Sequence, residues 1–189
     1  MKRRIVVACA AAGLAALTAG ILLSMGRSPL GPDGRFGFWE GDVWSRFQSQ
    51  RLLDPYLFSH VAHGFLFYAL LHLSARRVPM RFRFLAAVAL EGAWEILENS
   101  PLVIDRYRAV TIALGYVGDS VLNSMSDLAM AAFGFLLARR LPTRASVALV
   151  LAMEIGTLFW IRDNLTLNVV MLVHPVDAIR EWQSAGRPR

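Results

Sequence analysis

The chain has 189 residues, of which 56% are hydrophobic and 18% are charged, and its mean hydropathy is +0.45. This composition is too apolar for an ordinary soluble domain, and the length allows one domain of several membrane-spanning helices. The net charge of +6 comes mostly from arginines clustered beside apolar segments, which suits anionic lipid headgroups and not nucleic acid. A single cysteine, Cys9, excludes an intrachain disulfide and a multi-thiolate metal site.

The first apolar run covers residues 5–25 and follows the basic residues Lys2, Arg3 and Arg4. It is long for a signal peptide and has no clear cleavage site, so we interpret it as an uncleaved N-terminal anchor helix. Residues 26–55 are rich in glycine and proline and are interpreted as a periplasmic linker. Within the linker, aromatic side chains in 39–47 are spaced either for an interfacial helix or for a plain loop.

A helical core is expected over residues 56–175. Its predicted membrane spans are 56–75, 84–97, 121–138 and 145–161. The run 165–173 is too short to span and is predicted to be interfacial or re-entrant, or a sixth span if it extends at both ends. The polar tail 176–189 is predicted to be a frayed amphipathic helix. The sequence thus predicts an all-α polytopic membrane bundle of about five transmembrane helices, in one integral membrane domain of residues 1–189.

The arginines also predict an orientation. The loops after the second and fourth spans are short, rich in arginine and free of acids, and with the N-terminal cluster they belong on the cytoplasmic side. In a bacterial inner membrane, five spans then place the N-terminus in the cytoplasm and the C-terminus in the periplasm. A homo-oligomer is left open.

Polar side chains within the apolar segments form the candidate site. Glu91, Glu95 and Glu98 share one helical face by their spacing. An acid at the centre of a membrane helix costs roughly 2.5–3.5 kcal/mol on insertion scales, so these acids need a pairing, a cation or a proton. The remaining candidates follow the same argument and are His60, His63, Asp119, Asn123, Asp127, and the arginines Arg106 and Arg108 of a predicted loop at 105–108, with Arg162 after the last span.

The predicted orientation brings these residues into one periplasmic layer. Candidate catalytic residues are Glu91, Glu95, His63, Asp119 and Asp127. Candidate substrate-binding residues, chosen to clamp an anionic group, are Arg106, Arg108, Asn123 and Arg162. A divalent metal such as zinc or manganese could be held by His60, His63 and Glu95.

Each group also has a structural alternative. The two histidines could simply hydrogen-bond helix neighbours or lie among headgroups. The glutamate face could form an ion-pair network with Arg106 or Arg108. Asn123 and Asp127 could serve as hydrogen bonds between helices.

Several strings resemble a family of uncharacterised multi-pass inner-membrane proteins found mainly in alphaproteobacteria. The strings are HVAHGFLFY from His60, WEILENS from Trp94, IDRYR from Ile104, GDSVLNSMSD from Gly118 and IRDNLT from Ile161. The resemblance covers residues 54–182 and implies a membrane location but no activity. The layout is more remotely similar to VanZ-type membrane proteins, which are associated with glycopeptide-antibiotic resistance. That similarity would rest on Asp54, His60, Tyr68, Glu91, Arg108, Asp119, Asn123 and Gly134, with a different spacing after Glu91.

Two classes of function follow from these residues. An enzyme would use the cavity to bind or modify a lipid or an envelope precursor, with a carboxylate or imidazole as the general base and a metal-activated water. A small transporter, a proton-coupled component or a membrane assembly factor would need no catalysis. A third, purely structural interpretation would use the polar layer for packing alone.

Overall fold

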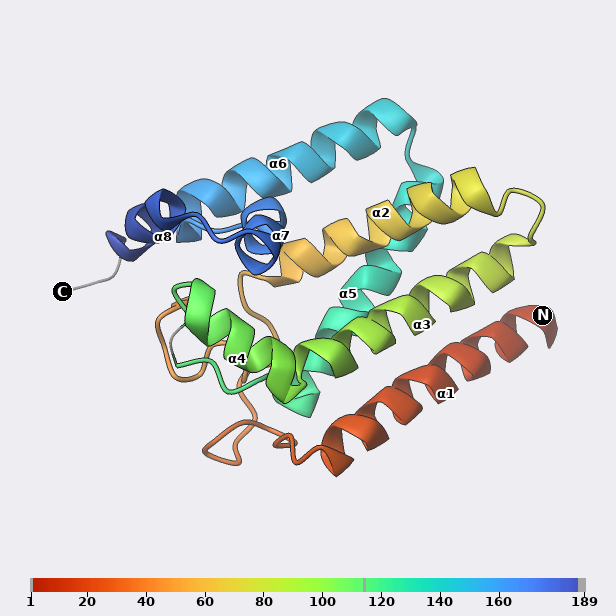
Figure 1. Ribbon diagram of the computed structural model, residues 1–189. Helices are drawn as coiled ribbons and strands as arrows, with labels where there is room; N and C mark the ends of the chain where they lie inside the picture. The colour runs from red at the N-terminus through yellow and green to blue at the C-terminus, as the bar shows by residue number, and fades with distance from the viewer. Residues whose placement is uncertain (1, 114, 187–189) are drawn as a thin grey trace.

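The computed structural model describes residues 2–113 and 115–186 of the chain (Figure 1). Over these residues the backbone is helical, with turns and one isolated parallel bridge between Trp39 and Leu53. The helices are α1 Lys2–Ser24, α2 Leu57–Ser74, α3 Met80–Glu98, α4 Pro101–Val110, α5 Val121–Arg140, α6 Thr143–Ile161, α7 Leu165–Val173 and α8 Asp177–Ser184. The predicted all-α class is confirmed.

Five long helices, α1, α2, α3, α5 and α6, run between the same two ends of the molecule (Figure 1). Four helices of the described chain are long and apolar enough to cross a membrane, namely α1 from Arg4, α2, α5 and α6. The fifth, α3, has 19 residues but carries two arginines and three glutamates. Those glutamates lie on its C-terminal half, and they are the acids from which the candidate site is built.

Helix α2 packs most extensively against α5, and this pair forms the apolar centre of the bundle. Val61, Phe65 and Ala138 are buried there. Gly64 and Gly134 let the two backbones meet, because a Cβ on Gly64 would overlap the carbonyl oxygen of Ala131 and one on Gly134 that of Val61. Close backbone approach through small residues is typical of helix pairs in membranes.

Three short helices, α4, α7 and α8, gather at the end of the bundle where α3 ends and α5 begins (Figure 1). Helix α5 begins after Ser120, whose hydroxyl accepts a hydrogen bond from Asn123 N at 3.2 Å. Asn164 caps α7 in the same way, accepting from Leu167 N at 2.8 Å. Such N-caps satisfy backbone donors that the helix itself leaves free.

The loop predicted at 105–108 is wrong, since these residues lie inside α4, which starts with Pro101 at a position where proline fits a helix. For 39–47, the structure has turns and the plain-loop alternative holds. Residues 165–173 form the nine-residue helix α7, which is not extended into a sixth span, and the helical tail is present as α8. Residues 187–189 of the predicted tail lie outside the described residues.

Candidate functional site

The site lies where α2 begins, α3 ends and α5 begins. We call six side chains the acid–imidazole cluster: His60, His63, Glu91, Glu95, Glu98 and Asp127. His60 and His63 lie in the first two turns of α2, and the three glutamates follow one face of α3. Glu91 and Glu95 are fully buried, at 0% exposure, and Asp127 is 4% exposed.

Glu91 holds both imidazoles. His60 Nδ1 lies 2.6 Å from Glu91 Oε1, and His63 Nδ1 lies 3.1 Å from Glu91 Oε2. An ionised carboxylate can only accept hydrogen bonds, so these contacts place the proton on Nδ1 of each ring. The Nε2 atom of His60 lies 3.8 Å from Asp127 Oδ2. Metal-binding histidines are commonly held by a carboxylate that fixes the ring tautomer in this way.

Glu95 and Asp127 have buried oxygens without protein partners. Both carboxylate oxygens of Glu95 and Oδ1 of Asp127 lack a hydrogen-bond donor among the described residues. An unsatisfied buried polar group costs about 1–3 kcal/mol, and more when it is charged. His60 Nδ1 is 3.5 Å from Glu95 Oε1, which is too far for a good hydrogen bond. These oxygens are the strongest sign that the cluster receives a cation or a proton.

Two sets of side chains come close enough to hold a metal ion. They are His60, His63 and Glu91, and His60, Glu95 and Glu98, with ligand atoms within 4.8 Å of one another in each set. The predicted metal site of His60, His63 and Glu95 does not occur as one set, because His63 belongs to the first set and Glu95 to the second. Because Glu91 already bonds both rings and Glu95 bonds none, the second set fits a cation better.

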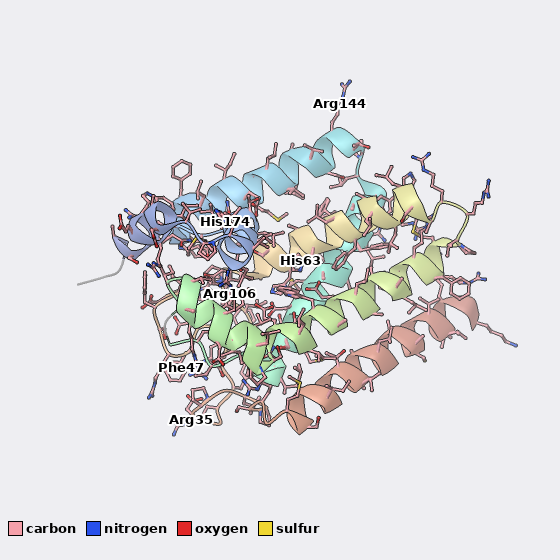
Figure 2. The ribbon with its side chains drawn as sticks, in the orientation of Figure 1. Arg35, Phe47, His63, Arg106, Arg144 and His174 are labelled. Atoms are coloured by element: carbon pink, nitrogen blue, oxygen red, sulfur yellow. The ribbon has the colours of Figure 1, made fainter. Side chains whose placement is uncertain are left out.

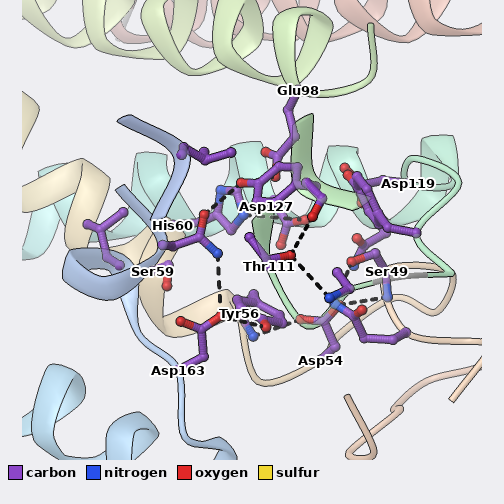
Figure 3. A pocket seen from close by; sticks show the side chains of 18 of the residues that line it. Ser49, Asp54, Tyr56, Ser59, His60, Glu98, Thr111, Asp119, Asp127 and Asp163 are labelled. Atoms are coloured by element: carbon purple, nitrogen blue, oxygen red, sulfur yellow. Dashed lines mark hydrogen bonds and ion pairs between the residues drawn. The ribbon is translucent and has the colours of Figure 1, made fainter. Parts of the chain in front are cut away.

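A cavity of about 150 Å³ opens beside the cluster (Figure 3). Its lining carries the two histidines and five acids: Asp54, Glu98, Asp119, Asp127 and Asp163. Three tyrosines and apolar side chains of α7 also line it. Neither lysine nor arginine is among its described lining residues, so the cavity suits a cation better than a bare anion.

Asp119 lies at the cavity edge and joins α3 to α5. Asn99 Nδ2 donates to Asp119 Oδ2 at 2.9 Å, and Asp119 N donates to Asn99 Oδ1 at 2.6 Å. Tyr116 OH donates to the other carboxylate oxygen at 2.9 Å. Burial raises the pKa of Asp119, and the hydrogen bonds from Tyr116 and Asn99 oppose that rise. With these bonds made, Asp119 is better placed to position its neighbours than to react.

Asp54 and Asp163 close the outer part of the cavity. Asp54 accepts hydrogen bonds from Ser49 N and Tyr56 N, and Asp163 accepts one from Tyr56 OH at 3.0 Å. Burial raises the pKa of both acids to about 6, against the effect of those hydrogen bonds. Tyr56 therefore links the start of α2 to the loop after α6.

The predicted arginines do not line the cavity. Arg106 Nε donates to the carbonyl of Leu172 at 2.9 Å and ties α4 to α7. Arg108 donates to the carbonyl of Tyr116. Arg162 donates to the carbonyl of Trp182 at 2.8 Å and lies over its ring, 5.4 Å from the centroid. Each guanidinium thus fastens a short helix or loop, while Asn123, the fourth predicted binding residue, does reach the cavity.

Sequence reasoning missed Asn99, Tyr56 and Tyr107. Asn99 follows Glu91 and Glu95 at spacings of eight and four, so the glutamate face itself pointed to it. Tyr107 OH contacts both Glu98, at 3.1 Å, and Asn168, at 2.8 Å. The spacing of residues in the sequence could not predict Tyr107, because it reaches the site only through the packing of α4 against α7.

Comparisons with known proteins identify the relatives of this chain. A UPF0314 protein of Sphingopyxis alaskensis is 53% identical over 176 residues, covering 93% of this chain and 94% of the relative. Another, of Rhizobium johnstonii, is 54% identical and covers 84% of this chain and 82% of the relative. One of Paracoccus denitrificans is 51% identical, with 87% and 85% covered.

No solved structure matches the chain. These comparisons do not show the remoter similarity to VanZ-type proteins. The family model for DUF2585, a protein of unknown function, matches residues 22–185. The chain therefore belongs to the uncharacterised DUF2585 family, together with its UPF0314 relatives.

Proposed function

We propose that this protein is an inner-membrane enzyme of the cell envelope that uses a divalent cation held by His60, Glu95 and Glu98. The observation that carries the proposal is the buried Glu95 carboxylate, which has no protein donor among the described residues and lies beside an imidazole held by Glu91. A bound cation would offset the cost of burying these acids. Zinc or manganese suits a ligand set of imidazole and carboxylate.

The substrate class follows from the cavity. We infer that the polar part of a lipid or envelope precursor enters it, past the apolar side chains of α7. An anionic group would be received by the cation, since no described arginine lines the cavity. The metal, when bound, would polarise that group or activate water. Asp127 faces His60 at 3.8 Å and is placed to take up a proton during the reaction.

Orientation is part of the proposal. The N-terminus and the arginine-bearing connections α2–α3 and α5–α6 gather at one end of the bundle, and the acid–imidazole cluster lies toward the other (Figure 1). The positive-inside rule puts the first end in the cytoplasm. With α3 counted as a fifth span, the cavity faces the periplasm.

The main alternative is a transporter or proton-coupled component without catalysis. Its support is the set of unpartnered carboxylates, which also suits a proton relay. Against a through path, α2 and α5 touch through Gly64 and Gly134 just beyond the cavity, and Val61 and Phe65 fill the space around them. This close apolar contact favours a pocket that a substrate enters from one side only.

The test begins with metal content. The protein purified in mild detergent from cells grown with zinc and manganese should carry about one metal ion per chain, measured by mass spectrometry of the elements. His60→Ala and Glu95→Gln should lose that metal. Glu154→Gln is the matched control, because Glu154 is also an acid in a membrane-type helix but binds the N-terminus of α7 through Leu165 N and Thr166 N.

Envelope lipids of a deletion strain then separate enzyme from transporter. A lipid or precursor species should accumulate in the deletion strain and in a strain carrying Glu95→Gln, and should return to normal with the Glu154→Gln protein. A metal-free wild-type protein would overturn the metal centre. Unchanged lipids together with altered solute or pH tolerance would favour transport.

A further inference from the structure

A second site lies at the opposite end of the bundle, away from the acid–imidazole cluster. An open groove of about 730 Å³ runs between α1, α3 and α5. Its floor is apolar and includes Phe135, which is 1% exposed, and Phe84, which packs edge-on against it at 5.6 Å. Helices of a membrane bundle leave such grooves open to lipid chains when their side chains do not meet.

Four arginines from three helices surround this groove. Arg4 comes from α1, Arg81 from α3, and Arg139 and Arg140 from the end of α5. All four are exposed. None of them has an acidic side chain within ion-pair distance among the described residues. The sequence explains this, since residues 2–24, 57–90 and 128–153 contain neither aspartate nor glutamate.

We propose that this groove is a binding site for an anionic phospholipid, whose phosphate lies among the four arginines and whose acyl chain lies along the apolar floor. Guanidinium groups bind phosphate in a planar, two-pronged geometry, which a lipid headgroup offers. Basic pockets between membrane helices are a known way of holding such headgroups. A free phosphate would leave the apolar floor uncovered, so the groove favours a lipid over a soluble anion.

The site differs from the general basic surface of this end. Arg76 and Arg77 lie in the turn between α2 and α3 and do not line the groove, and Arg144 points away from the bundle at the start of α6 (Figure 2). These three serve as a built-in comparison. They carry the same charge on the same side, but they do not border the apolar floor of the groove.

The experiment measures lipid retention by the full-length protein. Native mass spectrometry of the delipidated protein in detergent should show one phosphatidylglycerol bound at lipid concentrations where phosphatidylcholine does not bind. Arg81→Gln/Arg139→Gln should weaken this binding roughly 10- to 30-fold, because each substitution removes one guanidinium from the lipid phosphate. The matched control Arg76→Gln/Arg144→Gln removes the same charge and should change the affinity less than about twofold, because neither arginine lines the groove and charges at a distance are screened.

Two further measurements keep the result decisive. Arg81→Lys/Arg139→Lys should bind more weakly than wild type but better than the glutamine variant, which shows that the fold tolerates substitution there. Inorganic phosphate should not displace the lipid. Equal loss in the control variant, displacement by phosphate, or equal binding of phosphatidylcholine would each overturn the site. A second protein chain in the groove would appear as a dimer without lipid and would also overturn it.

Discussion

Two glutamates within the long helices of this protein have opposite surroundings. Glu154 accepts hydrogen bonds from Leu165 N at 3.1 Å and Thr166 N at 3.0 Å, so its charge lies at the start of α7, where a helix attracts anions. Glu95 has no such donor among the described residues and is fully buried. Glu154 is explained by the hydrogen bonds that it accepts from α7, whereas Glu95 fits the cation site or proton site proposed above. The two acids of the bundle therefore differ in whether the described residues supply hydrogen-bond donors to them.

The sequence predicted the acids of the site better than their partners. The spacing of Glu91, Glu95 and Glu98 determines a shared face on any helix, and the structure has that face turned toward α2. Which histidine contacts which glutamate depends on helix rotation and packing, which no local pattern contains. Arg106 and Arg162 donate to backbone carbonyls. Every residue has a backbone carbonyl, so the sequence cannot indicate which one an arginine will contact.

Asp163 gives a pH prediction. Burial raises its pKa from 3.8 to about 6. Between pH 4 and 6 the folded state therefore binds a proton at Asp163 that the unfolded state does not bind. The free energy of unfolding rises as the pH falls from 6 to 4. Above pH 6 the buried carboxylate is charged, and its full destabilising effect is present. The total is about 3 kcal/mol at most, from roughly two pKa units. Thermal unfolding in detergent at pH 4, 5, 6 and 7 measures it.

The comparison is Asp163→Asn, which cannot titrate and can still bond Tyr56 OH and Asn164 N. Acidification from pH 6 to pH 4 should stabilise the wild type more than this variant. Asp54 has a similarly raised pKa and contributes to both proteins, so only the difference between them reports Asp163. Parallel pH profiles for the two proteins would contradict the assignment.

At the level of whole helices, the long ones were predictable and the short ones were less so. Apolar length determines α1, α2, α5 and α6, because a bilayer requires about 20 apolar residues. Residues 105–108 of helix α4 were predicted as a loop, because Asp105, Arg106 and Arg108 are charged and the ten residues of the helix show no long apolar run. It is held by packing against its neighbours, including the Tyr107 OH bond to Asn168 on α7. Tertiary contacts decide such short helices.

The contact between α2 and α5 can be tested through its glycines. Gly64→Ala should lower the free energy of unfolding by about 1–3 kcal/mol, because the added methyl group must displace the α5 backbone at Ala131. Gly156→Ala on α6 is the matched control, since a Cβ there meets no atom within 4 Å. That change should be neutral or stabilising, as alanine favours a helix over glycine. Thermal unfolding in one detergent compares them, and equal destabilisation would argue against the close contact.

For the whole molecule, the separation of charge between its two ends implies an orientation in the membrane. The N-terminus and the α2–α3 and α5–α6 connections lie at one end of the bundle (Figure 1). Basic side chains without nearby acids occupy that end, whereas buried acids and histidines occupy the other part of the bundle. If the first end is cytoplasmic, then Thr143 at the start of α6 faces the cytoplasm and Ser184 at the end of α8 faces the periplasm. Both side chains are exposed and suitable for labelling.

Single cysteines at these positions, in a Cys9→Ser background, test that arrangement. In cells with a permeabilised outer membrane, a membrane-impermeant maleimide should label Ser184→Cys and should label Thr143→Cys only after lysis. Labelling of both cysteines from outside would mean that α6 does not cross the membrane, and the reverse pattern would place the cavity on the cytoplasmic side. In the second case the lipid groove would face the periplasm, but its arginines and apolar floor would be unchanged. The metal centre and the lipid site are therefore tested by metal content and by lipid retention, independently of the orientation. The labelling decides only which compartment supplies the substrate.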